Sequence, residues 1–177
     1  MRRKPRGTRL FKRRQLLLYV LLDLSLIAIL AFGELLFQRT AAWIGHTALW
    51  TSVLILATGI YFVAVFIVSI PAAGTTLRPI AAGLALLIAH VLLAYAAIYL
   101  MLYQVYGSRA FTGETLTAAD FLYYSITTFT TTGYGDITSI HALSNAAAAS
   151  EMLVGFLSST VLMAVMVGKL LNRMAGD

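Results

Sequence analysis

The sequence predicts an all-α membrane protein with four transmembrane helices and one shorter helix that enters the membrane without crossing it. Only 11% of the 177 residues are charged and 60% are hydrophobic, and the mean hydropathy is +0.85. A water-facing surface needs considerably more charge than this. Apolar runs cover residues 16–37, 48–70, 79–103 and 142–171. Each approaches or exceeds the roughly 20 residues with which a helix crosses a bilayer.

Residues 1–15 form a basic segment in front of the first apolar run. Eight of the 13 Lys and Arg residues lie in it. Positive charge beside a transmembrane helix marks the cytoplasmic side and attracts anionic lipid. We therefore expect a multi-pass protein of the plasma membrane whose N- and C-termini are cytoplasmic. The same distribution makes nucleic acid an unexpected partner.

Residues 16–70 predict two peripheral transmembrane helices. Neither carries the repeated arginines of a voltage sensor. Asp23 and Glu34 are unusual in the first of them, because an acidic group at the bilayer centre costs about 2.5–3.5 kcal/mol. Two interpretations are open: Glu34 lies near the extracellular interface and only Asp23 is buried, bonded to a neighbouring hydroxyl, or the pair senses pH or lipid.

The segment between the third and fourth apolar runs is a polar, extracellular connection. Residues 104–116 predict an exposed turret. Thr117 followed by Asp120 is a pattern that starts a helix, because the carboxylate can cap the first turn. A helix over residues 118–130 is about 20 Å long, too short to span the membrane. A short helix followed by polar backbone predicts a re-entrant hairpin, which lipid tolerates only beside protein or a water-filled cavity.

Gly133 and Gly135 stand two residues apart in the polar stretch after this helix. Turning successive carbonyls to one side requires alternating right- and left-handed backbone, and glycine adopts the left-handed form at low cost. A row of converging carbonyls is stabilised by a desolvated cation, and the Thr131 hydroxyl can add one more oxygen. Residues 131–135 therefore predict an ion-selectivity filter.

The sequence TTGYG at residues 131–135 resembles the filter signature of the potassium-channel family. The resemblance covers about residues 79–173 and implies a pore domain. Its parts are an outer helix (79–103), a pore helix (118–130), the filter (131–135) and an inner helix (142–171). The resemblance also implies an inner-helix hinge at Gly155. The residues that it implies as support for the filter are Tyr123, Tyr124, Thr127 and Asp136.

Two positions depart from the family pattern. Thr132 stands where Val or Ile is more common, and we expect its side chain to point back toward the pore helix. Thr127 stands where some bacterial members carry a glutamate behind the filter. A carboxyl pair with Asp136 is therefore excluded, and we expect Asp136 to bond Tyr123, Tyr124 or water.

The function that the resemblance implies is passive, potassium-selective conduction, with permeant K⁺ ions and no cofactor. Backbone oxygens of Thr131, Thr132, Gly133 and Tyr134, with the Thr131 hydroxyl, are the expected K⁺ ligands. One pore loop per chain implies a homotetramer around one axis. A nonselective cation channel and a pore subunit of a potassium transporter remain as alternatives. No His, Asp and Glu grouping has the spacing of a metal site or triad, so we expect no enzyme.

Further polar and apolar positions each allow two interpretations. His90 is either a packed, hydrogen-bonded histidine or a proton sensor. Glu151 either faces the cavity or bonds pore-helix hydroxyls such as those of Ser125 and Thr128. The last set shares one helix face at intervals of four residues, and forms either an apolar gate that closes by dewetting or a stripe packed on the third span. Its members are Ser159, Met163 and Val167.

Overall fold

The computed structural model describes residues 20–21, 23–28, 57 and 77–174. Its elements are α3 (Leu77–Tyr106), a 3-10 turn η1 (Gly107–Arg109), α4 (Ala118–Phe129) and α5 (Ala142–Met174). Within the described residues the only β pairing is an isolated bridge between Phe111 and Ser139. This part of the chain is therefore helical, as the sequence predicts.

The two long helices, α3 and α5, are both apolar. Within the described residues, Gly83–Arg109 and Ala142–Gly168 are long and apolar enough to cross a membrane. The sequence placed the outer helix at 79–103 and the inner helix at 142–171, whereas α3 and α5 extend slightly further. α3 begins before Pro79 because a proline is tolerated in the first helical turn, where backbone N–H groups lack helical partners.

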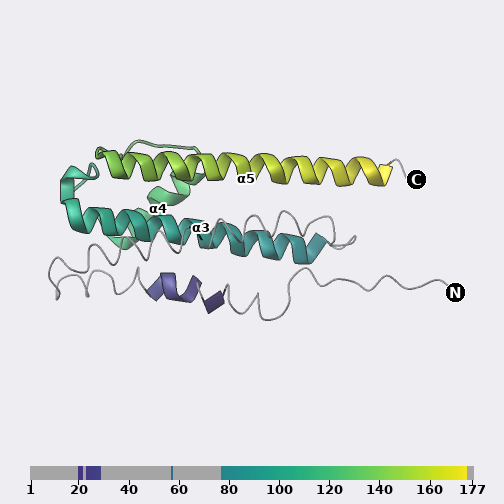
Figure 1. Ribbon diagram of the computed structural model, residues 1–177, viewed down its shortest axis with the longest axis horizontal. Helices are drawn as coiled ribbons and strands as arrows, with labels where there is room; N and C mark the ends of the chain where they lie inside the picture. Colours follow the sequence, from purple (N-terminus) through teal and green to yellow (C-terminus); the bar gives the residue numbers. More distant parts are fainter. Residues whose placement is uncertain (1–19, 22, 29–56, 58–76, 175–177) are drawn as a thin grey trace.

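The short helix α4 lies against both long helices. α3 and α5 run side by side in opposite directions, and α4 packs between them near the end that holds η1 (Figure 1). The chain thus runs along α3 to this end, turns back between the two long helices along α4, and finally runs away from this end along α5. The segment after α4, residues 130–141, lies at the same end of the pair.

The predicted peripheral helices lie largely outside the described residues, as does the basic segment 1–15. Of the first one, residues 20–21 and 23–28 are described and are helical. Leu26 of this piece is buried in the same hydrophobic cluster as α3, and Asp23 Oδ1 lies 2.8 Å from His90 Nδ1. Within the described residues, the first predicted span therefore meets the outer helix through the apolar side chain of Leu26 and the polar side chain of Asp23.

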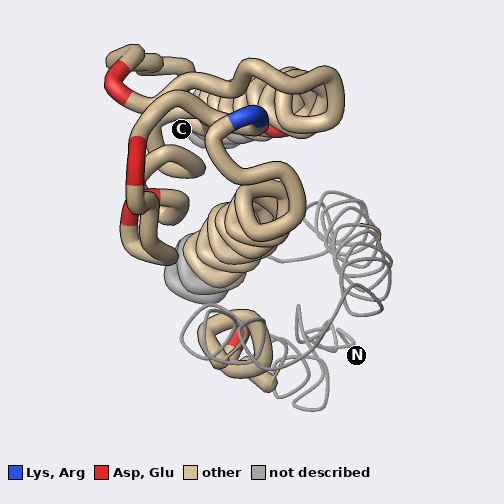
Figure 2. The backbone as a smooth tube through the Cα atoms, turned by 90° about the vertical axis from the view of Figure 1, so that its left-hand side faces the viewer, with Lys and Arg blue, Asp and Glu red and all other residues tan. Residues whose placement is uncertain are grey.

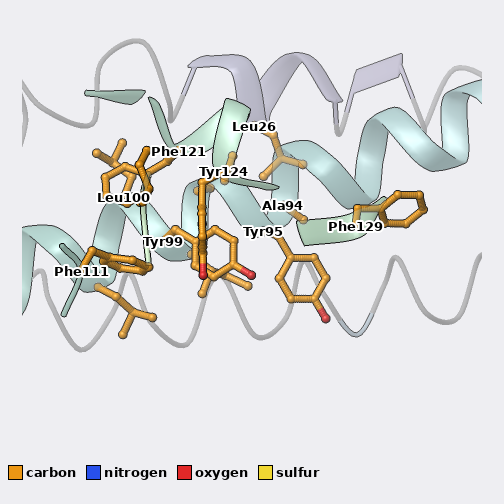
Figure 3. Close-up of a cluster of buried hydrophobic side chains, with 14 of the residues drawn as sticks. Leu26, Ala94, Tyr95, Tyr99, Leu100, Phe111, Phe121, Tyr124 and Phe129 are labelled. Atoms are coloured by element: carbon orange, nitrogen blue, oxygen red, sulfur yellow. The ribbon is translucent and has the colours of Figure 1, made fainter. Parts of the chain in front are cut away.

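Aromatic side chains join α3, α4 and the segment between them. The Tyr99 ring meets Tyr124 at 4.9 Å and Phe111 at 5.7 Å between centroids, both edge-on. Phe111 also meets Phe121 edge-on at 5.1 Å. Figure 3 shows these rings gathered beside α3. Each such pair contributes about 0.5–1.5 kcal/mol beyond area burial, so this cluster fixes α4 on α3.

Four charged residues of the described chain lie at the end that holds η1. Arg109, Glu114, Asp120 and Asp136 all belong to the connection between α3 and α5. Figure 2 looks onto this end, where one blue and several red segments interrupt the tan tube of the connection. This group of charges indicates that the η1 end of the membrane-embedded helix pair faces water.

The first turn of α4 is closed by the capping box that the sequence predicts. Thr117 is the N-cap residue, and its hydroxyl accepts from the Asp120 backbone N–H. The Asp120 carboxylate accepts from the Thr117 backbone N–H at 2.8 Å and from the Thr117 hydroxyl at 2.7 Å. These hydrogen bonds, the hydroxyl's first, lower the pKa of the Asp120 carboxyl.

Thr117→Ala should destabilise the protein by about 1 kcal/mol at neutral pH, since it removes a helix cap. A carboxyl whose pKa is lowered in the folded state stabilises above its unfolded pKa, and this contribution is lost as the pH falls through the folded value. The cost of Thr117→Ala should therefore shrink below about pH 4. Melting temperatures across pH measure this, with Ser108→Ala in η1 as control. A cost independent of pH contradicts the Asp120 contribution.

Candidate functional site

The backbone after α4 alternates in handedness. Thr131, Gly133 and Gly135 have φ values of 55°, 54° and 82°. Both glycines therefore adopt the left-handed form that the sequence predicts. Thr131 adopts it as well, although a left-handed conformation costs a residue with a Cβ about 1–2 kcal/mol. Surrounding contacts must hold Thr131 in place.

Those contacts come from the last turn of α4. The Thr127 carbonyl accepts from the backbone N–H of Thr132 at 2.9 Å and of Gly133 at 3.3 Å, while Thr131 N–H donates to the Thr128 carbonyl at 3.0 Å. The hydroxyls of Thr132 and Thr130 lie 2.9 Å apart. The Thr132 side chain therefore points back toward α4, as expected, and the segment 131–133 is anchored on the helix end.

Asp136 takes one of the partners expected for it. Its carboxylate accepts a hydrogen bond from the Tyr123 hydroxyl, and this bond raises the pKa of Tyr123. The Tyr123 ring also stacks on the Tyr134 ring, with centroids 6.4 Å apart and planes 5° apart. Tyr123 thus connects α4 to two positions at the outer end of the segment 131–136.

Tyr124 and Thr127 support the segment differently. The Tyr124 ring is buried against Tyr99 of α3. The Thr127 hydroxyl donates to the Tyr124 carbonyl at 3.0 Å within α4, so its backbone oxygen serves the filter segment and its side chain serves the helix. The structure thus brings Tyr123 and Asp136 together and keeps Tyr124 at the α3 interface.

A second anchor lies beyond Asp136 and was not predicted. Thr112 N–H donates to the Thr138 carbonyl at 2.9 Å, and Ile140 N–H donates to the Ala110 carbonyl at 2.9 Å. These bonds flank the bridge between Phe111 and Ser139. The sequence indicated only an exposed turret here. The available signal was Phe111, a large aromatic residue in a polar stretch, which is fully buried.

The Glu151 side chain is buried and hydrogen-bonded, so the cavity-facing interpretation is wrong. Its Oε1 lies 2.5 Å from Ser125 Oγ of α4, one of the two hydroxyls considered. Its Oε2 accepts from the Tyr99 hydroxyl of α3 at 2.6 Å. The sequence did not indicate Tyr99, because a tyrosine within an apolar run resembles any other membrane-facing aromatic residue.

His90 is also a buried, hydrogen-bonded residue. Its Nδ1 pairs with Asp23, and its Nε2 has no hydrogen-bond partner among the described residues. Asp23 therefore bonds an imidazole of α3, where the sequence predicted a hydroxyl partner. No local pattern connects these two residues, which are 67 positions apart.

At Gly155, α5 approaches the end of α4 closely enough to exclude a side chain. A Cβ built on Gly155 would overlap the backbone oxygen of Phe129 and lie 3.0 Å from its carbonyl carbon. α5 is continuous through this position. The hinge assignment stays a prediction. Close packing against Phe129 is a separate physical reason for a glycine at position 155.

The predicted gate positions lie on the open face of α5. Ser159, Met163 and Val167 are exposed, with 67% of Met163 and 46% of Val167 accessible. The described part of α3 in the same chain does not cover them. Packing on the chain's own third span is therefore wrong for this stripe, and a pore-lining role stays a prediction.

Residues 87–172 match the model of a protein family described as Ion channel. The matched region is just under half of the chain and contains most of α3, all of α4, the filter segment and most of α5. No curated protein and no solved structure matches the chain. The match supports ion-channel activity, and with the two apolar helices it supports a membrane location.

Proposed function

We propose that this chain is one subunit of a potassium-selective channel that conducts K⁺ passively across the plasma membrane. The observation that carries the proposal is the alternation of positive φ at residues 131, 133 and 135. This backbone follows a helix that is too short to cross a membrane and lies between two helices that are long enough.

The proposed ligands are oxygens of the filter segment. Backbone oxygens of Thr131, Thr132, Gly133 and Tyr134, with the Thr131 hydroxyl, replace the hydration shell of K⁺, as in filters built from rings of carbonyls. The permeant ion is the substrate, and no cofactor takes part.

Four copies around one axis complete the site. A single segment offers too few oxygens to surround an ion, and residues 131–136 are exposed on the chain. The α5 face also exposes large apolar side chains, among them Leu153, Phe156 and Leu157. Such surfaces mark contacts with lipid or protein. A closed ring of identical subunits buries part of this face and brings four filter segments together.

The proposed orientation places the polar end of α3 and α5 outside the cell. The filter then opens toward the extracellular side, and the two termini lie in the cytoplasm. The basic residues before position 15 contact anionic lipid of the inner leaflet.

Recording from reconstituted bilayers tests the proposal. With opposing K⁺ and Na⁺ gradients, the reversal potential should follow the K⁺ gradient. A reversal potential that follows neither ion alone indicates the nonselective alternative. Ion flux that saturates, as it does in a carrier, indicates the transporter. Native mass spectrometry should give four subunits. A stable dimer as the only conducting species contradicts the assembly.

Val167→Asp should raise the resting open probability if Met163 and Val167 form an apolar constriction, because a charged ring wets it. Met166→Asp is the matched control, since it places the same charge at a neighbouring exposed position on another face of α5. Open probability is recorded together with tetramer yield. Unchanged opening in an intact Val167→Asp tetramer removes the gate from this position.

A further inference from the structure

Three buried side chains from three helices meet at Glu151. Tyr99 comes from α3, Ser125 from α4 and Glu151 from α5, and each residue is 0% exposed. Tyr99 Oη lies 2.6 Å from Glu151 Oε2. Ser125 Oγ lies 2.5 Å from Glu151 Oε1 and 3.0 Å from the Leu92 carbonyl oxygen of α3. The cluster thus contains three oxygen–oxygen contacts.

Counting protons assigns a state to Glu151. The Tyr99 and Ser125 hydroxyls bring one proton each, and an ionised carboxylate brings none. One of the three contacts would then place lone pairs against each other. A protonated Glu151 supplies the third proton. Glu151 then donates to Ser125, Ser125 donates to the Leu92 carbonyl, and Tyr99 donates to the other Glu151 oxygen, so that every contact is a hydrogen bond.

The surroundings favour the same state. The titratable groups near Glu151 are the phenols of Tyr95 and Tyr99 on α3 and of Tyr124 on α4. Among the described residues the one ion pair is that of Asp23 with His90, so no described cation pairs with Glu151. An unpaired buried carboxylate is strongly disfavoured relative to its neutral form.

We propose that Glu151 is a positioning residue for the filter, which acts as a neutral carboxylic acid linking α5 to α4 and α3. This inference rests on the proposed function, because it names what sets the filter's position. A neutral acid is suited to the task since it both donates and accepts, whereas a carboxylate only accepts.

The link reaches the filter through α4. Glu151 meets Ser125, and four residues later Gly155 meets Phe129 on the same two helices. These two contacts lie one helical turn apart on each helix, so they fix both the height and the rotation of α4 against α5. Thr127 lies between the α4 positions, and its carbonyl accepts from the N–H groups of Thr132 and Gly133 in the filter segment.

Glu151→Gln separates the neutral acid from the carboxylate. An amide accepts from Tyr99 and donates to Ser125, so Glu151→Gln should keep K⁺ selectivity and sustained current, as should the control Glu114→Gln in the exposed turret. Glu151→Leu should make the current decay about tenfold faster, equivalent to about 1.4 kcal/mol. If Glu151→Gln fails to assemble, or if its current decays as fast as that of Glu151→Leu, the assignment of Glu151 as a neutral acid is overturned.

Ser125→Ala decides the positioning role if Glu151→Leu does not assemble. It removes the hydrogen bond between α5 and α4 and leaves the bond between Tyr99 and Glu151 in place, so the current should decay faster by a similar factor. Wild-type decay and selectivity in Ser125→Ala overturn the role.

Infrared difference spectroscopy of wild type against Glu151→Gln tests the protonation state without any current. The difference should contain the carbonyl stretch of a protonated carboxyl at neutral pH. Carboxylate bands in its place overturn the proposal. Because this readout is independent of ion selectivity, it separates failure of this inference from failure of the proposed function.

Discussion

Gly155→Ala should abolish conduction. The added Cβ would overlap a backbone oxygen, that of Phe129, and a backbone atom cannot rotate away as a side chain does. Either α5 or the end of α4 must move, and overpacking of this kind costs about 1–3 kcal/mol, occasionally more. Two residues beyond Phe129 the filter segment begins, so movement of α4 is transmitted to it. We expect loss of K⁺ current together with reduced tetramer yield.

Gly168→Ala is the matched control for this change. Gly168 lies on the same helix, and a Cβ built there meets nothing within 4 Å. The Gly168→Ala variant should assemble normally, since alanine is a better helix former than glycine. The comparison also separates two roles for Gly155. A hinge glycine replaced by alanine leaves an assembled channel with altered opening, whereas a contact glycine leaves no functional channel. Wild-type assembly and current in Gly155→Ala contradict the contact.

Local signals in the sequence were sufficient for the elements around the filter. The capping box needs only Thr117 and Asp120, which are three positions apart. The left-handed backbone at Gly133 and Gly135 follows from two glycines spaced by two in a polar stretch after a short helix. The helix bounds follow from apolar run length, which is why α3 and α5 fall close to the runs 79–103 and 142–171.

Contacts between distant residues were not predictable in the same way. The bond between Tyr99 and Glu151 joins residues 52 positions apart, and that between Asp23 and His90 joins residues 67 apart. Tyr and His occur in apolar runs for several reasons, and nothing in their own neighbourhood indicates the partner. The sequence shows that acidic residues in a membrane span cost free energy. The contacts that offset this cost depend on how the helices pack.

Thr131 shows the limit of residue type as a guide to backbone shape. A β-branched residue predicts extended or right-handed backbone, yet its φ is 55°. Backbone hydrogen bonds from Thr131 to the Thr128 carbonyl, and from the next two residues to the Thr127 carbonyl, override that preference. The local rule therefore identified two of the three left-handed positions and missed the one that neighbouring backbone imposes.

Gly135→Ala should collapse potassium permeation. Gly135 has a φ of 82°, and a Cβ there meets nothing within 4 Å in the chain. The cost is therefore conformational, about 1–2 kcal/mol in each subunit and roughly 4–8 kcal/mol over four subunits. Gly107→Ala is the matched control, because Gly107 has a φ of 61° and equally open space but lies in η1. It should lower stability and leave the K⁺-over-Na⁺ reversal potential unchanged. Because the backbone strain is similar at the two sites, the comparison separates an effect on ion selectivity from an effect on stability. If Gly135→Ala also keeps the wild-type reversal potential, residues 131–135 do not select the ion.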